Sequence, residues 1–164
     1  MDLDAYRAAA ETFVGELNRE YYRHFAGLSD DFEIEAVYAR HARLFTREAV
    51  EELRAGVHDG PAGGDDARRR RHLLDFGVEG LLGRATTAQE AELARREAAL
   101  SLEVDGARIG FRESSVEQAN EPDGGRRERI EVARLAAIEE HLTPLRREAL
   151  DAQHGLAREL GWSS

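Results

Sequence analysis

The stretch RRERIEVARLAAIEEHLTPLRREALDAQHGLAREL, residues 126–160, indicates the class of fold. Its apolar residues recur every three or four positions, the spacing that lines one face of a helix. That stripe consists of Ile130, Ala133, Ala137, His141, Leu145, Ala149, Leu156 and Leu160. Thr143-Pro144 interrupts it, because proline lacks a backbone donor and clashes with the preceding turn. We expect either a kink there or a second helix that Thr143 caps, with Pro144 at its first position. Gly161 is expected to end the helix, and Trp162 to fold back onto its last turn.

The same spacing predicts a long helix at the start of the chain. Its stripe consists of Leu3, Tyr6, Ala10, Phe13, Leu17, Tyr21, His24 and Leu28. Asp30, with Glu33 three residues later, then has the pattern of a helix N-terminus. The stripe that follows consists of Ile34, Val37, Tyr38, His41 and Leu44. Thr46 is expected to start a further short helix.

A segment rich in glycine and proline separates these N-terminal helices from the rest of the chain. Residues 58–66, HDGPAGGDD, hold four glycines or prolines among polar residues, and this composition predicts a flexible loop. From Asp66 the chain is expected to be helical again. Leu74, Val78, Leu81 and Leu82 should share one side of that helix, and a threonine-rich junction at 86–87 either interrupts the helix or lies within it.

One segment departs from the helical pattern. In residues 99–112, ALSLEVDGARIGFR, two short alternating runs flank Asp105-Gly106, a pair that favours a tight hairpin turn. We expect a β-hairpin near residues 102–111. Because two strands alone are marginal in water, the hairpin must pack on helices or join a larger sheet.

Composition limits the partners and the compartment. The chain has 164 residues, a net charge of -10 and no cysteine, so one core, an acidic surface and no disulfide are expected. The acidic surface argues against nucleic acid as a partner. No apolar run has the length of a membrane span, and the start of the chain is acidic, unlike a signal peptide. We therefore expect a soluble cytoplasmic protein with no membrane partner.

Six histidines raise the question of a metal. A helical zinc peptidase motif, HExxH, needs a His-Glu dipeptide, and the chain contains none. A di-metal bundle would need Glu-x-x-His pairs, but Glu20 with His24 has the wrong spacing, and Asp151 with His154 uses the shorter carboxylate. His24, His41 and His141 fall on apolar stripes, where buried packing residues are expected. The sequence therefore assigns no catalytic, cofactor-binding or metal-ligating residue.

Two other features have competing interpretations. The run Arg68–Arg71 points around a helix axis and is flanked by aspartates, so a solvated helix start is favoured over a phosphate or RNA site. Tyr21, Tyr22, Phe25 and Trp162 are candidates for a peptide-binding or partner-binding groove. The favoured alternative places Tyr21 and Phe25 in the core, with Tyr22 at its edge.

Residues 79–162 resemble the N-terminal helical region of zinc oligopeptidases of the thimet oligopeptidase and oligoendopeptidase F kind. The phrases that carry the resemblance are VDGARIGFR, ANEPDGGRRERIEVA and HLTPLRREALDAQHGLARELGW. The resemblance implies helices that form one wall of a deep channel for short peptides. It also implies that zinc and the HExxH ligands belong to a catalytic portion that lies downstream of this region, so no residue of this chain inherits a catalytic role.

The sequence thus predicts a mainly α fold, an antiparallel helical bundle with one small β-hairpin. Residues 1–164 are expected to be a single helical domain or the N-terminal part of a larger peptidase-like protein, inactive alone. The missing catalytic portion and short peptides are its expected partners. The alternative is a stand-alone helical interaction or dimerisation module, and a homo-oligomer fits that alternative. If the chain is a fragment, one helical stripe should remain exposed as an apolar patch.

Overall fold

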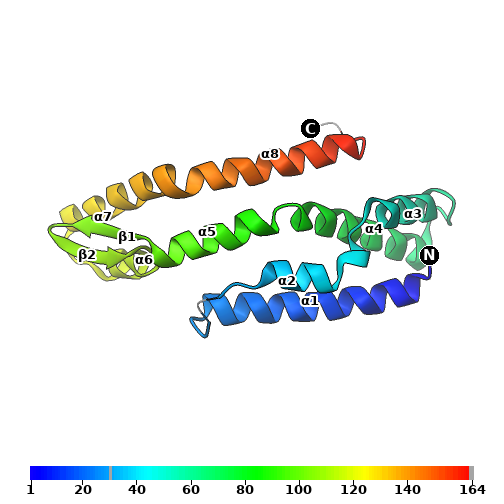
Figure 1. The fold of residues 1–164 in the computed structure, drawn as a ribbon, viewed down its shortest axis with the longest axis horizontal. Helices are drawn as coiled ribbons and strands as arrows, with labels where there is room; N and C mark the ends of the chain where they lie inside the picture. Colours follow the sequence, from blue (N-terminus) through cyan, green and yellow to red (C-terminus); the bar gives the residue numbers. More distant parts are fainter. Residues whose placement is uncertain (30, 163–164) are drawn as a thin grey trace.

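The computed structural model describes residues 1–29 and 31–162 and is mainly helical, with one two-stranded antiparallel sheet in this part of the chain (Figure 1). The described elements follow the order α1 (Leu3–Phe25), α2 (Ile34–Arg40), the 3-10 turn η1 (Ala42–Leu44), α3 (Arg47–His58), α4 (Gly64–Arg84), α5 (Thr87–Ala99), β1 (Ser101–Val104), β2 (Ala107–Gly110), α6 (Phe111–Asn120), α7 (Gly124–Ala137), the π-helical turn η2 (Ile138–Leu142) and α8 (Thr143–Glu159). The predicted fold class, mainly α with one hairpin, is confirmed.

Local capping explains some of the helix ends. The Thr46 hydroxyl accepts a hydrogen bond from the Ala49 amide at 3.1 Å and so starts α3 as expected. The first helix ends at Phe25, earlier than its apolar stripe suggested, because Gly27 turns the chain with a φ of 71°. The loop between α3 and α4 spans only residues 59–63, shorter than the expected 58–66. The predicted cap at Asp30 lies outside the described residues.

A glycine face on α4 organises the first hydrophobic cluster. Gly77, Gly80 and Gly83 follow one another at intervals of three, so they lie along one side of the helix. A Cβ atom at Gly80 would overlap the Phe45 ring, and one at Gly83 would lie 2.5 Å from the Tyr38 hydroxyl. The glycines let large side chains reach the α4 backbone. The buried members of this cluster are Tyr6, Phe13, Val37, Leu44, Phe45, Val50, Leu53, Leu73, Leu81 and Leu160.

A second cluster surrounds the hairpin. Asp105 and Gly106 both have positive φ, 54° and 76°, as the predicted tight turn requires. The strands are 101–104 and 107–110, and Phe111 begins α6 instead of ending β2. The hairpin packs on α7, as its marginal size demands. The buried residues here are Leu102, Val104, Ile109, Phe111, Ile130, Ala137 and Leu142.

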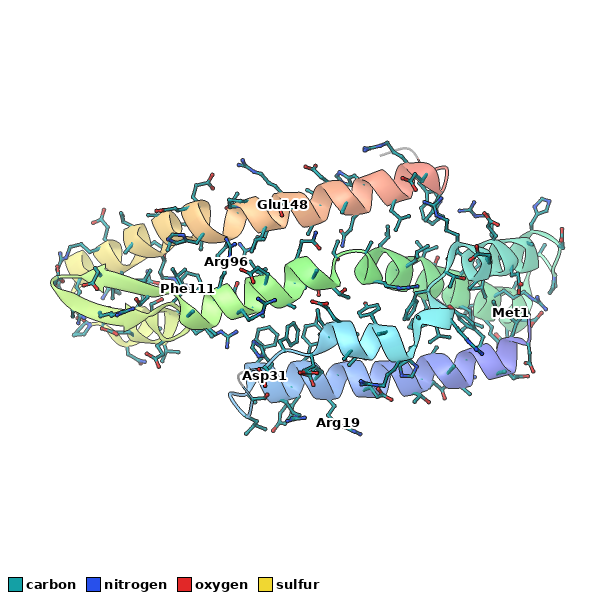
Figure 2. All side chains as sticks on the ribbon, in the orientation of Figure 1. Met1, Arg19, Asp31, Arg96, Phe111 and Glu148 are labelled. Carbon is teal, nitrogen blue, oxygen red and sulfur yellow. The ribbon has the colours of Figure 1, made fainter. Side chains whose placement is uncertain are left out.

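The expectation of one core is wrong, because the buried residues form two separate clusters. Figure 2 places Phe111 near the hairpin end and Met1 near the opposite end of the elongated molecule. Two long antiparallel helices, α5 and α8, connect the ends. Their register is set by Arg96, which donates to the His141 carbonyl at 3.2 Å, and by Gln153, which donates to the Thr86 hydroxyl at 3.3 Å.

Pro144 is accommodated by a change of helix type. The Thr143 amide donates to the Ile138 carbonyl, five residues back, so residues 138–142 form a π-helical turn. The wider turn removes the contact that a proline ring would make with the carbonyl of Glu140. Thr143 is the first residue of α8 and does not cap it, so the alternative of two separately capped helices is wrong.

The end of α8 is attached to the first cluster. The Trp162 amide donates to the Ala157 carbonyl and the Gly161 amide to the Arg158 carbonyl, which is the Schellman geometry expected of Gly161. Arg54 on α3 donates to the Leu160 carbonyl at 3.1 Å and lies 5.2 Å from the centre of the Trp162 ring. Leu160 itself is buried in the first cluster. The two ends of the molecule are therefore joined through α8.

We expect Gly80→Ala to destabilise the protein by about 1–3 kcal/mol, because the new methyl group would overlap the fully buried Phe45 ring. Gly15→Ala is the matched control, since nothing lies within 4 Å of a Cβ there, and helix propensity should make it stabilising by about 0.5–1 kcal/mol. Urea unfolding measures both free energies. Equal effects of the two substitutions would contradict the glycine-face packing.

Burial raises the pKa of Tyr6 to about 12, and its hydroxyl donates to the Leu44 carbonyl at 3.0 Å. Because the folded pKa lies above the ordinary value of 10.0, this contribution to stability is complete below pH 10 and is lost as the pH rises towards 12. Tyr6→Phe should reduce that alkaline loss while lowering stability at neutral pH. Urea unfolding at increasing pH measures this. Some loss should remain in the variant, because burial and the Glu90 carboxylate also raise the pKa of Tyr21 and Tyr38.

Candidate functional site

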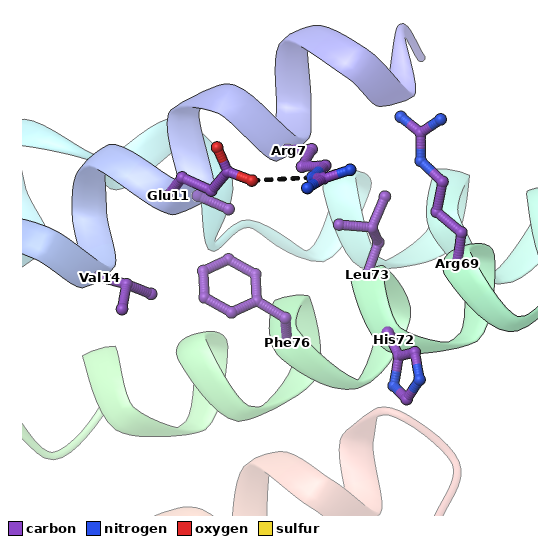
Figure 3. Close-up of a pocket in the computed structure, with 8 residues that line it drawn as sticks. Arg7, Glu11, Val14, Arg69, His72, Leu73 and Phe76 are labelled. Atoms are coloured by element: carbon purple, nitrogen blue, oxygen red, sulfur yellow. Dashed lines mark hydrogen bonds and ion pairs between the residues drawn. The ribbon is translucent and has the colours of Figure 1, made fainter.

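Two parallel helices, α1 and α4, border an apolar hollow. Asp4 pairs with Arg69, and the Phe13 ring packs on Phe76, so the two helices run in the same direction. We call this hollow the α1/α4 groove, and its volume is about 470 Å³ (Figure 3). It is lined by Arg7, Ala10, Glu11 and Val14 of α1 and by Arg69, His72, Leu73 and Phe76 of α4.

The floor of the α1/α4 groove is apolar and packs on buried aromatic rings. Phe76 makes edge contacts with Tyr6 and Phe13 at ring-centre distances of 6.4 and 6.1 Å. Leu73 is buried, whereas Val14 keeps 40% of its surface exposed. Both helices contribute residues at i, i+3, i+4 and i+7, the positions that face one side of a helix. A groove with two such rows fits a third helix or an apolar ligand.

Charged groups lie at one end of this groove. Arg7 donates to Glu11 at 2.8 Å, and Figure 3 shows this pair beside the apolar floor. Arg69 pairs with Asp4 through one terminal nitrogen, while its buried Nε has no hydrogen-bond partner among the described residues. That Nε is too buried for an incoming group to reach, but Arg7 pairs through its Nε alone and Arg69 through one terminal nitrogen, so both guanidinium groups keep donors for a carboxylate or carbonyl oxygen.

A second hollow lies between the two connecting helices. The α5/α8 groove has a volume of about 310 Å³ and is lined by Gln89, Glu90, Leu93, Leu145, Arg146, Ala149, Leu150 and Gln153. Arg146 pairs with Glu97 at 3.3 Å and so links α8 to α5. Half the surface of Leu150 is exposed. Of its apolar residues, Leu145 and Ala149 belong to the stripe that the sequence predicted for α8, whereas Leu150 does not and Leu93 lies on α5.

The candidate aromatic residues do not form one groove. Tyr21, Phe25 and Phe32 gather near α5, where the Tyr21 hydroxyl donates to Glu90 at 3.1 Å. Phe25 is 58% exposed and Tyr21 is 37% exposed, so the expectation that both are core residues is wrong: their rings pack on each other and on Phe32 and belong to neither buried cluster. Trp162 packs on Arg54 of α3, at the other end of the molecule.

The three histidines of the apolar stripes differ in their surroundings. His24 is buried as expected, and its Nε2 lies 2.6 Å from Arg112, which also donates to the Ala94 carbonyl. His41 is half-buried, with Nε2 3.3 Å from Glu16. The His141 side chain, in the π-helical turn η2, is 43% exposed and belongs to neither buried cluster, so its predicted burial is wrong.

The residue pairs considered for a di-metal site do not come together as metal ligands. Glu20 accepts a hydrogen bond from the Glu33 amide at 2.8 Å, and His24 is engaged by Arg112. Within residues 1–29 and 31–162, no three His, Asp or Glu side chains are arranged to hold a metal ion. In the same residues, no helix combines the length and the apolar character needed to cross a membrane.

The arginine run on α4 spreads around its helix as predicted. Arg68 pairs with Asp65, Arg69 with Asp4 and Arg70 with Asp66, so neighbouring arginines have different partners. Arg70 also donates to the Gly56 carbonyl at 3.4 Å. These contacts attach the start of α4 to α1 and α3, and they do not form one flat basic patch.

Comparisons with protein-family models, with curated proteins and with solved structures find no match.

The α1/α4 groove should bind the dye 1-anilinonaphthalene-8-sulfonate, because an apolar floor ends beside arginines that can face the sulfonate. We expect Val14→Glu to remove most of the dye fluorescence. Val116→Glu is the control, since Val116 is exposed on α6, away from the groove. Unchanged fluorescence in the Val14 variant, or a larger loss in Leu150→Glu, would place the dye elsewhere.

Proposed function

We propose that this chain is the non-catalytic, N-terminal helical region of a zinc-oligopeptidase-like protein and forms one wall of its peptide channel. The proposal rests on the resemblance of residues 79–162 to such regions. That segment runs from the end of α4 through the hairpin and along α8. It therefore includes both connecting helices and the whole α5/α8 groove.

The observation that carries the proposal is that the two connecting helices, α5 and α8, have few buried side chains. Along their length only Ala91 and Ala94 of α5 and Leu145 of α8 are buried. Leu93, Ala149 and Leu156 are half-buried, and Leu150 is exposed. A helix pair that covers so little of its apolar stripe has a face left for a peptide or for a further portion of protein.

Zinc would be held by the catalytic portion of such a protein. The residues described here do not fit a zinc site, because His24 is hydrogen-bonded to Arg112 and no three suitable ligands converge within the described residues. The role proposed for this chain is to shape the channel. No bond-breaking step is assigned to its residues.

A stand-alone helical interaction module is the second candidate. The α1/α4 groove favours it, because a groove of about 470 Å³ with two rows of helix-facing residues lies outside the segment that carries the peptidase resemblance. For such a module, cooperative unfolding and a defined oligomer are expected.

The reading frame that follows Ser164 in the source gene tests the first proposal. We expect it to encode HExxH, and we expect the protein portion it encodes to cleave short peptides only when mixed with this chain and zinc. Leu150→Glu should weaken this complementation, because it puts a charge in the α5/α8 groove, whereas the exposed Val116→Glu should not. A stop codon directly after Ser164, or cleavage that is independent of this chain, would contradict the proposal.

A further inference from the structure

A stripe of α7 faces away from the second cluster. Ile130 and Ala137 are the buried residues of this helix, and positions 128, 132, 135 and 139 lie opposite them at 100° per residue. Val132 is 61% exposed and Leu135 is 55% exposed. These two apolar side chains lie between Glu128 and Glu139, both exposed carboxylates.

The residues of this α7 stripe, Glu128, Val132 and Leu135, have the same spacing along their helix as residues that line the α1/α4 groove. Its residues are at i, i+4 and i+7, as are positions 7, 11 and 14 of α1 and positions 69, 73 and 76 of α4. Seven helical residues rise about 10 Å in each case. A helix placed in the groove parallel to α1 would therefore bring Val132 and Leu135 over the apolar floor when Glu128 lies level with Arg7 and Arg69.

The charges are complementary in that register. Glu128 makes no ion pair within residues 1–29 and 31–162, while Arg7 and Arg69 each use only one nitrogen in their pairs with Glu11 and Asp4. The groove lining holds Arg7, Arg69 and His72 against one carboxylate, Glu11, although the chain as a whole has a net charge of -10. This end of the groove thus offers guanidinium donors to a carboxylate of the same acidic protein.

We propose that α7 of a second copy of this chain docks into the α1/α4 groove. Glu128 of the second copy approaches Arg69, and its Val132 and Leu135 cover Val14, Leu73 and Phe76. The groove and the α7 stripe lie at opposite ends of the elongated molecule, so one chain cannot satisfy both (Figure 1). The contact is therefore head-to-tail, and repetition of it builds a ring or an open chain of copies.

The proposal is independent of the channel-wall role, because it uses neither the α5/α8 groove nor a catalytic portion. It rests on the second candidate function, the helical interaction module, and names a second copy of the chain as the occupant of the α1/α4 groove. The contact involves about two turns of one helix. The area that it buries is therefore smaller than the roughly 1,200 Å² of a standard stable interface. Association is therefore expected to be weak and to depend on concentration. Salt should weaken it further, since the carboxylate and arginines meet near solvent.

Sedimentation velocity over a concentration series tests this contact. The wild-type protein should rise above the mass of one chain as its concentration increases. Val14→Glu blocks the groove and Leu135→Glu blocks the α7 stripe, and both replace exposed residues, so the fold should be retained. Each variant alone should stay monomeric, whereas Val116→Glu should associate like the wild type.

Mixing the two variants gives the decisive result. The Val14 variant keeps an intact α7 stripe and the Leu135 variant keeps an intact groove, so the mixture should form a two-chain complex and nothing larger. Glu128→Arg should also abolish association, because it would place a cation beside Arg69. The proposal is overturned if the wild type remains monomeric at all concentrations, if the Leu135 or Glu128 variant associates normally, or if the mixture stays monomeric.

Discussion

The close approach of Phe45 to the backbone of α4 is the contact on which the first half of the molecule depends. Gly80 leaves the space for the ring, and Gly77 and Gly83 extend the same bare strip towards Leu53 and Tyr38. Because side chains from α1, α2 and α3 all contact this strip, these three helices pack against α4. Leu73 and Phe76 lie on the same side of α4, one turn before the strip, and there they border the α1/α4 groove.

The break between α4 and α5 is tied to α8. Thr86 is fully buried, its hydroxyl donates to the Gly83 carbonyl at 3.2 Å, and it accepts from Gln153 at 3.3 Å. Further along, α8 ends inside the first cluster at Leu160, where Arg54 binds its carbonyl. The helices α5 and α8 therefore connect the two clusters and keep them apart. The α5/α8 groove lies between these helices, where neither cluster fills the space.

Both proposed surfaces follow from this elongated arrangement. A rounder bundle would bury the outer stripe of α7 and the apolar side of α8 in one core. Here each cluster is small, so Val132, Leu135 and Leu150 remain exposed, and the surfaces that need a partner lie on different elements. The α5/α8 groove belongs to the segment with the peptidase resemblance, whereas the α1/α4 groove does not. The channel-wall role and the contact between copies are thus separable properties of the same chain.

The sequence alone determined the features that depend on near neighbours in the chain. The helical stripes, the Thr46 cap, the Asp105-Gly106 turn and the glycine end at Gly161 all arise within a few residues, so periodicity and turn chemistry predict them. The three glycines of α4 were visible at intervals of three, but their role depends on Phe45, 35 residues before Gly80, and on Tyr38, 45 residues before Gly83. The exposure of Phe25 and His141, the division into two clusters and the pairing of α1 with α4 were decided by tertiary structure. Periodicity says which side of a helix is apolar, and only packing says whether another element covers it.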